Sequence, residues 1–165
     1  MLFRSQKELE RNQVPLVAVS RAHIDMIDFD SVKKYIATQE FDRIFFSVGP
    51  APCKSLGMMY QNLDLLTILL KVLDSLGKSP KFIYISSDAV YGDVDSNPRT
   101  ENTNPYPNTL HGKMHLIRES ILQASNLPIL ILRCSAIFGF GDPHNSYGPN
   151  RFYKELLDRK STRLN

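Results

Sequence analysis

Two histidines four residues apart, His111 and His115, are the first candidates for chemistry in this sequence. An imidazole has an unperturbed pKa of about 6.5, so it can accept or donate a proton near neutral pH. On a helix both rings share one face with Glu119, and this is a spacing that zinc ligands use. Gly112 stands where the glutamate of a His-Glu-x-x-His motif would stand. Proton transfer, zinc binding and simple exposure to solvent or a cleft are therefore three interpretations of the pair.

A serine lies within the most distinctive segment of the chain, Phe82 to Gly92, which reads Phe-Ile-Tyr-Ile-Ser-Ser-Asp-Ala-Val-Tyr-Gly. The first half of this segment is an apolar run typical of a buried strand, and Ser87 follows that run directly. A hydroxyl at the carboxyl end of a strand can hydrogen-bond a ligand oxygen, although an ordinary polar strand end has the same sequence. Tyr106 is a second hydroxyl, a phenol on the proline-rich loop before the histidines.

The elements that must position these residues alternate between strand and helix patterns, without repeats or low-complexity linkers. Helices are expected over residues 2–12, from an N-cap at Asp30 or Ser31 to Thr38, over about 56–77 and over 109–124. Strands are expected at residues 16–19, 24–27, 43–48, 81–86 and 129–133. Apolar strands that alternate with helices indicate a parallel sheet covered on both faces. The predicted fold is a doubly wound, Rossmann-like α/β sheet, which binds ligands beyond the carboxyl ends of its strands.

Three segments resemble the extended short-chain dehydrogenase/reductase superfamily, which includes NAD-dependent nucleotide-sugar epimerases, dehydratases and reductases. They are the string that ends in Val90-Tyr91-Gly92, the stretch from Glu101 through Pro105, Pro107 and His111-Gly112-Lys113-Met114-His115 to Glu119, and the stretch from Leu132-Arg133 to Gly141-Asp142-Pro143. By this resemblance, Ser87 hydrogen-bonds the reacting oxygen of the sugar. His111 replaces the family's acid/base tyrosine. His115 replaces the lysine that lowers the pKa of that tyrosine and holds the nicotinamide ribose. Tyr106 could instead supply a phenol from its loop.

The resemblance adds candidates for cofactor and substrate binding. Asp25 resembles the family's adenine contact, and Asn62 lies on the long helix. Arg21 follows the expected strand at residues 16–19, which corresponds to the family's second strand, and an arginine there can favour NADP over NAD. Asn150 and Arg151 would start a helix, where a guanidinium suits a diphosphate of the substrate. A helix cap with a surface arginine explains the last two equally well, and Arg21 could simply be solvated.

Both ends of the chain depart from the family pattern. The family opens with a strand and a glycine-rich turn that hold the pyrophosphate of NAD(P), whereas no glycine here precedes Gly49. Residues 158–165, Asp-Arg-Lys-Ser-Thr-Arg-Leu-Asn, resemble a translated sequencing adaptor. We therefore interpret residues 1–157 as a fragment: a partial NAD(P)-binding domain with the start of the substrate-binding region, its sheet incomplete at both ends.

The composition excludes several classes of protein. Hydrophobic residues make up 42% and charged residues 22% of the chain, which is typical of a folded domain. The net charge is +3, and without residues 158–165 the chain has 17 basic and 16 acidic residues. This small excess of positive charge does not indicate nucleic-acid binding. Asp64, Lys71 and Asp74 interrupt the longest apolar stretch, so no membrane span is expected. The chain does not open with a basic segment followed by an apolar one, so no secretion signal is expected. Cys53 and Cys134, in unlike contexts, suggest reduced thiols in a cytoplasmic protein.

The sequence thus predicts a parent enzyme that uses NAD or NADP to modify a nucleotide sugar, as an epimerase, dehydratase or reductase in polysaccharide synthesis. A homodimer that holds a nucleotide sugar and no metal is expected. The alternative is a non-catalytic module that binds a dinucleotide or nucleotide sugar, because the family's tyrosine and lysine are replaced.

The chain as given is expected to bind NAD(P) weakly or not at all, because it lacks the glycine-rich turn and the family's first strand. Calorimetric titration of the 165-residue chain with NAD and with NADP should show no micromolar binding. A micromolar dissociation constant for either nucleotide would refute this expectation.

Overall fold

The computed structural model describes residues 9–20, 22–93, 98–135, 152–153 and 156. Its elements follow in the order α2 (Phe29–Ala37), β1 (Arg43–Phe46), α3 (Leu56–Ser75), β2 (Lys81–Ser87), the short 3-10 helix η1 (Asp88–Tyr91), α4 (Leu110–Gln123) and β3 (Ile129–Cys134). Residues 9–11, within the helix expected at the start of the chain, also have helical backbone.

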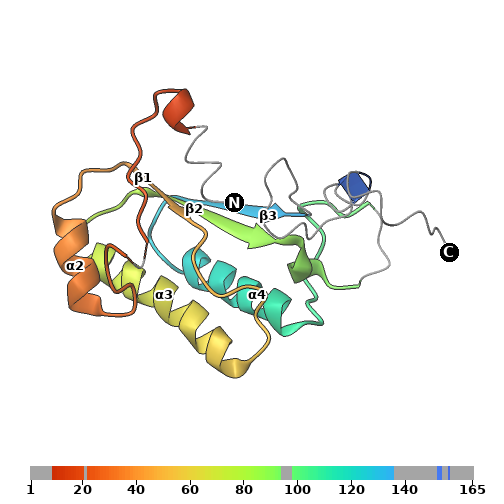
Figure 1. Cartoon of the computed structure of the whole chain (residues 1–165). Coiled ribbons are helices and arrows are strands. Elements are labelled where there is room, and N and C mark those ends of the chain that lie inside the picture. The colour runs from red at the N-terminus through yellow and green to blue at the C-terminus, as the bar shows by residue number, and fades with distance from the viewer. Residues whose placement is uncertain (1–8, 21, 94–97, 136–151, 154–155, 157–165) are drawn as a thin grey trace.

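The three strands form one parallel sheet in the order β1-β2-β3, and α2, α3 and α4 lie on the same side of it (Figure 1). The register pairs Phe46 with Tyr84 and Tyr84 with Ile131. Each pair of neighbouring strands is joined through a helix, α3 between β1 and β2 and α4 between β2 and β3. This arrangement confirms the predicted Rossmann-like α/β class.

A polar side chain starts each of the three helices. Asp28, Ser55 and Thr109 cap α2, α3 and α4, and each accepts a hydrogen bond from the backbone N–H three residues further on. Such caps satisfy amide groups that have no partner inside the helix. The expected N-cap of α2 at Asp30 or Ser31 was wrong, because the Asp28 carboxylate takes the Ser31 amide at 2.7 Å.

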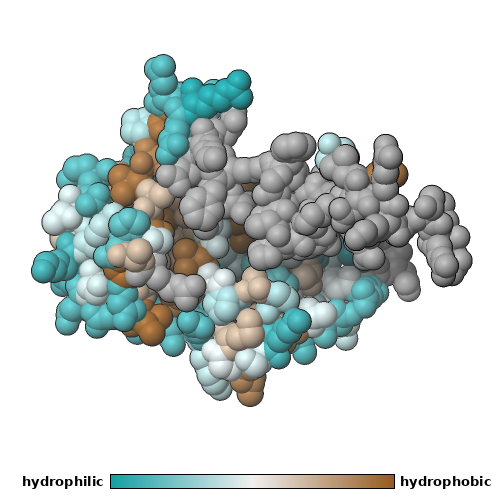
Figure 2. Space-filling model, viewed as in Figure 1, coloured by the Kyte–Doolittle hydropathy of each residue, from teal (hydrophilic) through white to brown (hydrophobic). Residues whose placement is uncertain are grey.

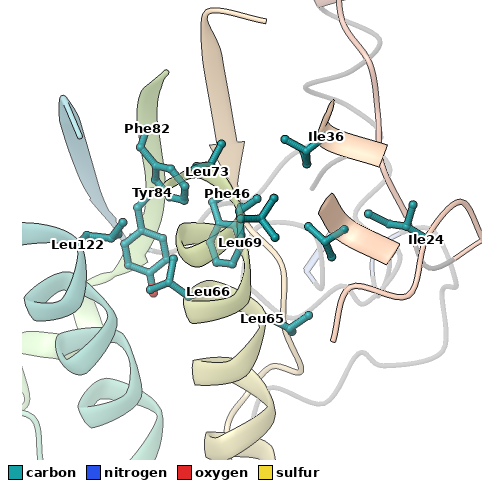
Figure 3. Close-up of a cluster of buried hydrophobic side chains, with 12 residues drawn as sticks. Ile24, Ile36, Phe46, Leu65, Leu66, Leu69, Leu73, Phe82, Tyr84 and Leu122 are labelled. Carbon is teal, nitrogen blue, oxygen red and sulfur yellow. The ribbon is translucent and has the colours of Figure 1, made fainter. Parts of the chain in front are cut away.

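The core lies between the sheet and α3, where aromatic side chains of β1 and β2 meet leucines of the helix (Figure 3). The rings of Phe46 and Phe82 are 5.6 Å apart, a tilted arrangement that aromatic pairs favour. The described hydrophobic residues with no exposed surface are Val32, Leu66, Val72, Phe82, Tyr84, Val90 and Leu122. Burial of this apolar surface is what holds the helices against the sheet.

By length and composition, α3 alone among the described helices is apolar enough to cross a membrane, despite its three charged residues. In the structure, however, Leu66, Leu69 and Leu73 of this helix belong to the core (Figure 3). The side of the molecule seen in Figure 2 is mostly hydrophilic over the helices, with hydrophobic side chains scattered among the polar ones. These observations identify α3 as the central helix of a packed domain.

Two expected strands, at residues 16–19 and 24–27, are absent from the described structure. Residues 14–20 form no regular element, and Val17 is exposed, while residues 26–27 form a turn in which Asp25 accepts from the Ile27 amide at 3.1 Å. A strand needs a neighbour for its backbone groups, and in the described part of the chain β1 pairs with β2 alone. Ile24 nevertheless contributes its side chain to the core (Figure 3).

Replacing Leu66 with alanine should lower the free energy of unfolding by about 2–5 kcal/mol, since the side chain is fully buried and its removal leaves a cavity. Leu56→Ala on the same helix is the matched control. Leu56 is 61% exposed, so we expect a change within about 0.5 kcal/mol. Urea unfolding of the two variants measures the difference, and equal effects would contradict the assignment of α3 to the core.

Candidate functional site

Ser87 is the last residue of β2 and begins the turn into η1. Its Oγ accepts a hydrogen bond from the Ala89 amide at 3.2 Å and donates one to Asp88 Oδ1 at 3.2 Å. The hydroxyl therefore lies at the carboxyl end of a central strand, the edge where sheets of this class bind ligands. Its two local hydrogen bonds fix the direction of the turn that follows it.

The first turn of α4 packs directly against η1 through a glycine. A Cβ atom added at Gly112 would lie 2.2 Å from the carbonyl oxygen of Ala89, so no side chain fits at this position. This close contact places the segment that carries His111 beside the turn that follows Ser87. The absence of a side chain at Gly112 is thus a packing requirement between two parts of the candidate site.

The two histidine rings meet edge to face, with centroids 4.6 Å apart. Nδ1 of His111 accepts a hydrogen bond of 3.2 Å from the backbone N–H of Cys53, in the loop between β1 and α3. Nδ1 of His115 is 2.6 Å from the hydroxyl of Tyr84 on β2. The pair is therefore held from both sides, by a loop at His111 and by the sheet at His115.

The surroundings keep both imidazoles neutral. Burial lowers the pKa of His115 to about 3, and nearby His111 and Arg118 add to the effect. Burial also lowers the pKa of His111, although the Asp88 carboxylate opposes the shift. A neutral ring at position 115 can hydrogen-bond a hydroxyl, but it cannot supply the positive charge that a lysine would bring.

Arg118, one turn after His115, is a site residue that the sequence did not reveal. Its buried guanidinium donates to the backbone carbonyls of Asn62 (2.9 Å from Nε) and Val48 (2.9 Å from Nη1). The same group lies over the ring of Phe46, 5.1 Å from the centroid. A helical pattern alone cannot distinguish a buried arginine of this kind from an exposed one.

Asn62 was predicted to contact the cofactor, and the structure shows what its side chain does within the protein. The amide is 1% exposed, and its Nδ2 donates to the carbonyls of Pro50 and Met58 at 3.0 and 2.8 Å. Its Oδ1 has no partner in the described structure and lies where a Cβ of Gly49 would be, 2.1 Å away. Gly49 has a φ of +139°, which only glycine adopts readily, so this loop turns sharply over Asn62.

Glu119 does not join His111 and His115 as a third metal ligand in this structure. The Glu119 carboxylate is 1% exposed and accepts hydrogen bonds from Ser86 at 2.6 Å and from Arg133 at 2.8 Å. In the part of the chain that the structure describes, no three histidine, cysteine, aspartate or glutamate side chains gather as a metal site. Glu119 instead joins α4 to β2 and β3.

The remaining candidates are exposed or lie outside the described residues. Arg21, Asn150 and Arg151 fall on residues that the structure does not describe. Asp25 is exposed in a turn, and Tyr106 is 74% exposed on its loop. Their predicted roles remain predictions.

The residues described here fit only one end of a dinucleotide cofactor. His115 carries a ring nitrogen, Nε2, that could hydrogen-bond a ribose hydroxyl, and its other ring nitrogen lies beside the Tyr84 hydroxyl of β2. No glycine precedes Gly49, so the described chain offers no glycine-rich turn for a pyrophosphate.

Comparison with known proteins gives a consistent set of relatives. The sequence model described as the NAD dependent epimerase/dehydratase family matches residues 4–163. The chain is 27% identical over 148 residues to a trifunctional UDP-glucose 4,6-dehydratase/UDP-4-keto-6-deoxy-D-glucose 3,5-epimerase/UDP-4-keto-L-rhamnose-reductase of Arabidopsis thaliana, an alignment that covers 82% of this chain and 21% of that protein.

Solved structures show the same relationship. The UDP-glucose 4-epimerase of Bifidobacterium longum, in complex with NAD+ and UDP, has a TM-score of 0.57 and 27% identity, over 66% of this chain and 36% of that one. RMD from Pseudomonas aeruginosa, complexed with NADPH, has a TM-score of 0.68 over 86% of this chain and 52% of that one, and at 24% identity it shows the fold. The chain spans about a fifth to a half of the length of these three relatives.

The low pKa of His115 makes the fold sensitive to acid. Between about pH 6.5, the value of an unfolded histidine, and about pH 3, the unfolded chain binds a proton that the folded chain excludes. Stability should therefore fall as the pH is lowered through this window, by up to about 1.4 kcal/mol per pH unit from this residue. His115→Gln should make the decrease shallower in urea unfolding between pH 7 and pH 5.

His23→Gln, which removes an exposed histidine, controls for the loss of an imidazole as such. Parallel pH dependence in the H115Q variant and the unchanged chain would mean that His115 is not the buried neutral group described above.

Proposed function

The chain belongs to the NAD-dependent epimerase/dehydratase family, and from that premise we propose that its parent protein uses NAD or NADP to modify a nucleotide sugar. One observation carries the proposal. The hydroxyl of Ser87 stands at the carboxyl end of β2, and the turn after it packs against the first turn of α4, which carries His111. These are the positions from which two polar groups could reach one sugar oxygen.

In this proposal each side chain has a separate task. Ser87 donates a hydrogen bond from its hydroxyl to a sugar oxygen, in place of the weak hydrogen bond that it donates to Asp88. His111 contacts the same oxygen, and His115 hydrogen-bonds a ribose hydroxyl of the cofactor without adding charge. The cofactor, when bound, would accept or donate a hydride at the sugar carbon.

The relatives support the proposed substrate class. The epimerase structure from Bifidobacterium longum holds UDP, and the plant protein is named for UDP-sugar reactions. We propose that the substrate of this protein is also a nucleotide sugar. We further propose that the protein acts in polysaccharide synthesis, in the cytoplasm and as a homodimer. Whether the reaction is epimerisation, dehydration or reduction would follow from the products formed.

The second candidate is a binding module that holds a nucleotide sugar or dinucleotide without reaction. The neutral histidine pair favours it, because neither ring supplies the cation that lysine provides in the family. The parent protein, incubated with NAD(P) and a panel of nucleotide sugars, separates the two. Absorbance of reduced cofactor or a changed sugar supports the enzyme, whereas binding without either supports the module.

For the enzyme, His111→Ala should lower turnover by about a hundredfold or more, the usual loss when a polar group at the reacting oxygen is removed. Cofactor affinity should change little in this variant, whereas His115→Ala should weaken it. Lys113→Ala, an exposed neighbour on the same turn, is the control and should keep turnover near that of the unchanged protein. Unchanged turnover in H111A would move the role to Tyr106 or to a water.

A further inference from the structure

The hydrogen bond from Cys53 to His111 determines which ring nitrogen carries the proton. A backbone N–H can only donate, so Nδ1 of His111, 3.2 Å from the Cys53 nitrogen, must present a lone pair. In a neutral imidazole with a bare Nδ1, the proton is on Nε2. Within the described part of the chain, Nε2 of His111 makes no hydrogen bond, so its N–H is available to a ligand.

The donor at Cys53 is itself held firmly in place. The Cys53 side chain is buried in a small cluster with Met59 and Met114, and its Sγ lies 3.8 Å from the Ser55 carbonyl oxygen. Asn62 fixes the same loop at Pro50. The direction of the Cys53 N–H therefore depends on the packing between β1 and α3 and does not adjust freely to His111.

The groups around His111 do not favour a second proton on the ring. His115 contacts it edge on, and Arg118 on the same helix face adds positive charge near the pair. Asp88 on η1 is the opposing group, since its carboxylate favours a charged imidazole. A proton on Nδ1 would also point at the Cys53 N–H, so both the imidazolium and the other tautomer lose that bond.

We propose that the Cys53 backbone amide fixes His111 as a neutral donor, whose Nε2–H binds an oxygen of the sugar substrate and does not act as a general base. The identity of that oxygen rests on the proposed function, but the tautomer does not. An Nε2 that already carries a proton cannot take one from a sugar hydroxyl. His111 is then a group that polarises or orients the oxygen, and Cys53 is its positioning residue.

The tautomer can be measured without substrate. Long-range proton–nitrogen NMR of the histidine-labelled chain at neutral pH should show a pyridine-type Nδ1 and a pyrrole-type Nε2 for His111, with the signals assigned by their loss in H111Q. Cys53→Ser, which keeps the amide, should preserve this pattern. Cys53→Pro removes the N–H donor together with the buried thiol, whose loss the Cys53→Ser variant controls for, and it should shift His111 toward a mixture of tautomers. An Nδ1–H form or an imidazolium in the unchanged chain would overturn the proposal, whether or not C53P folds.

A second arm uses the parent protein and its nucleotide-sugar reaction. Glutamine can place an N–H close to Nε2 but cannot act as a base, so His111→Gln should keep turnover within about tenfold while His111→Phe should lose about a hundredfold or more. Equal losses in both variants would identify His111 as a base and overturn the proposal. No turnover in the unchanged protein would count against the proposed enzyme function alone, because the NMR result stands by itself.

Discussion

The arrangement of the candidate site depends on one buried cation. The guanidinium of Arg118 has no carboxylate partner within ion-pair distance among the described residues, and it is held by carbonyl groups of Asn62 and Val48 and by the faces of two aromatic rings. A buried charge is tolerated only when its hydrogen bonds are made, so these carbonyls must stay where they are. Arg118 thus joins α4 to α3 and to the end of β1, and it keeps the histidine face of α4 against the loop that contains Cys53.

The next residue on α4, Glu119, is a buried negative charge. Its carboxylate forms an ion pair with Arg133 and accepts a hydrogen bond from Ser86. Arg133 also donates a hydrogen bond from Nη1 to the hydroxyl of Tyr91, 3.0 Å away. Arg118 and Glu119, which are adjacent on α4, therefore connect this helix to β1 and α3 on one side and to β2, β3 and η1 on the other. The turn that carries the histidines precedes both attachments, and its position follows from them.

The sequence was sufficient for elements whose pattern is local. The apolar run before Ser87 predicted β2 to within one residue, and the helix expected over residues 109–124 is α4 with its two capping residues included. The strand at residues 16–19 could not be judged in this way, because a strand forms only if a neighbour pairs with it. Likewise Cys53 and His111 are 58 positions apart. Their contact depends on how α3 and α4 pack, which neither periodicity nor spacing reports.

The positive charge of Arg118 near His115 also constrains how such a site could change over evolutionary time. A lysine at position 115 would place an ammonium group one helical turn from a guanidinium in the same buried environment, and like charges there oppose each other. A histidine-to-lysine exchange would therefore be harmful until position 118 had lost its charge. Loss of the Arg118 side chain first would leave the carbonyls of Asn62 and Val48 without their donor. Whichever of the two substitutions came first, the resulting protein would be less stable, so His115 and Arg118 would tend to be inherited together.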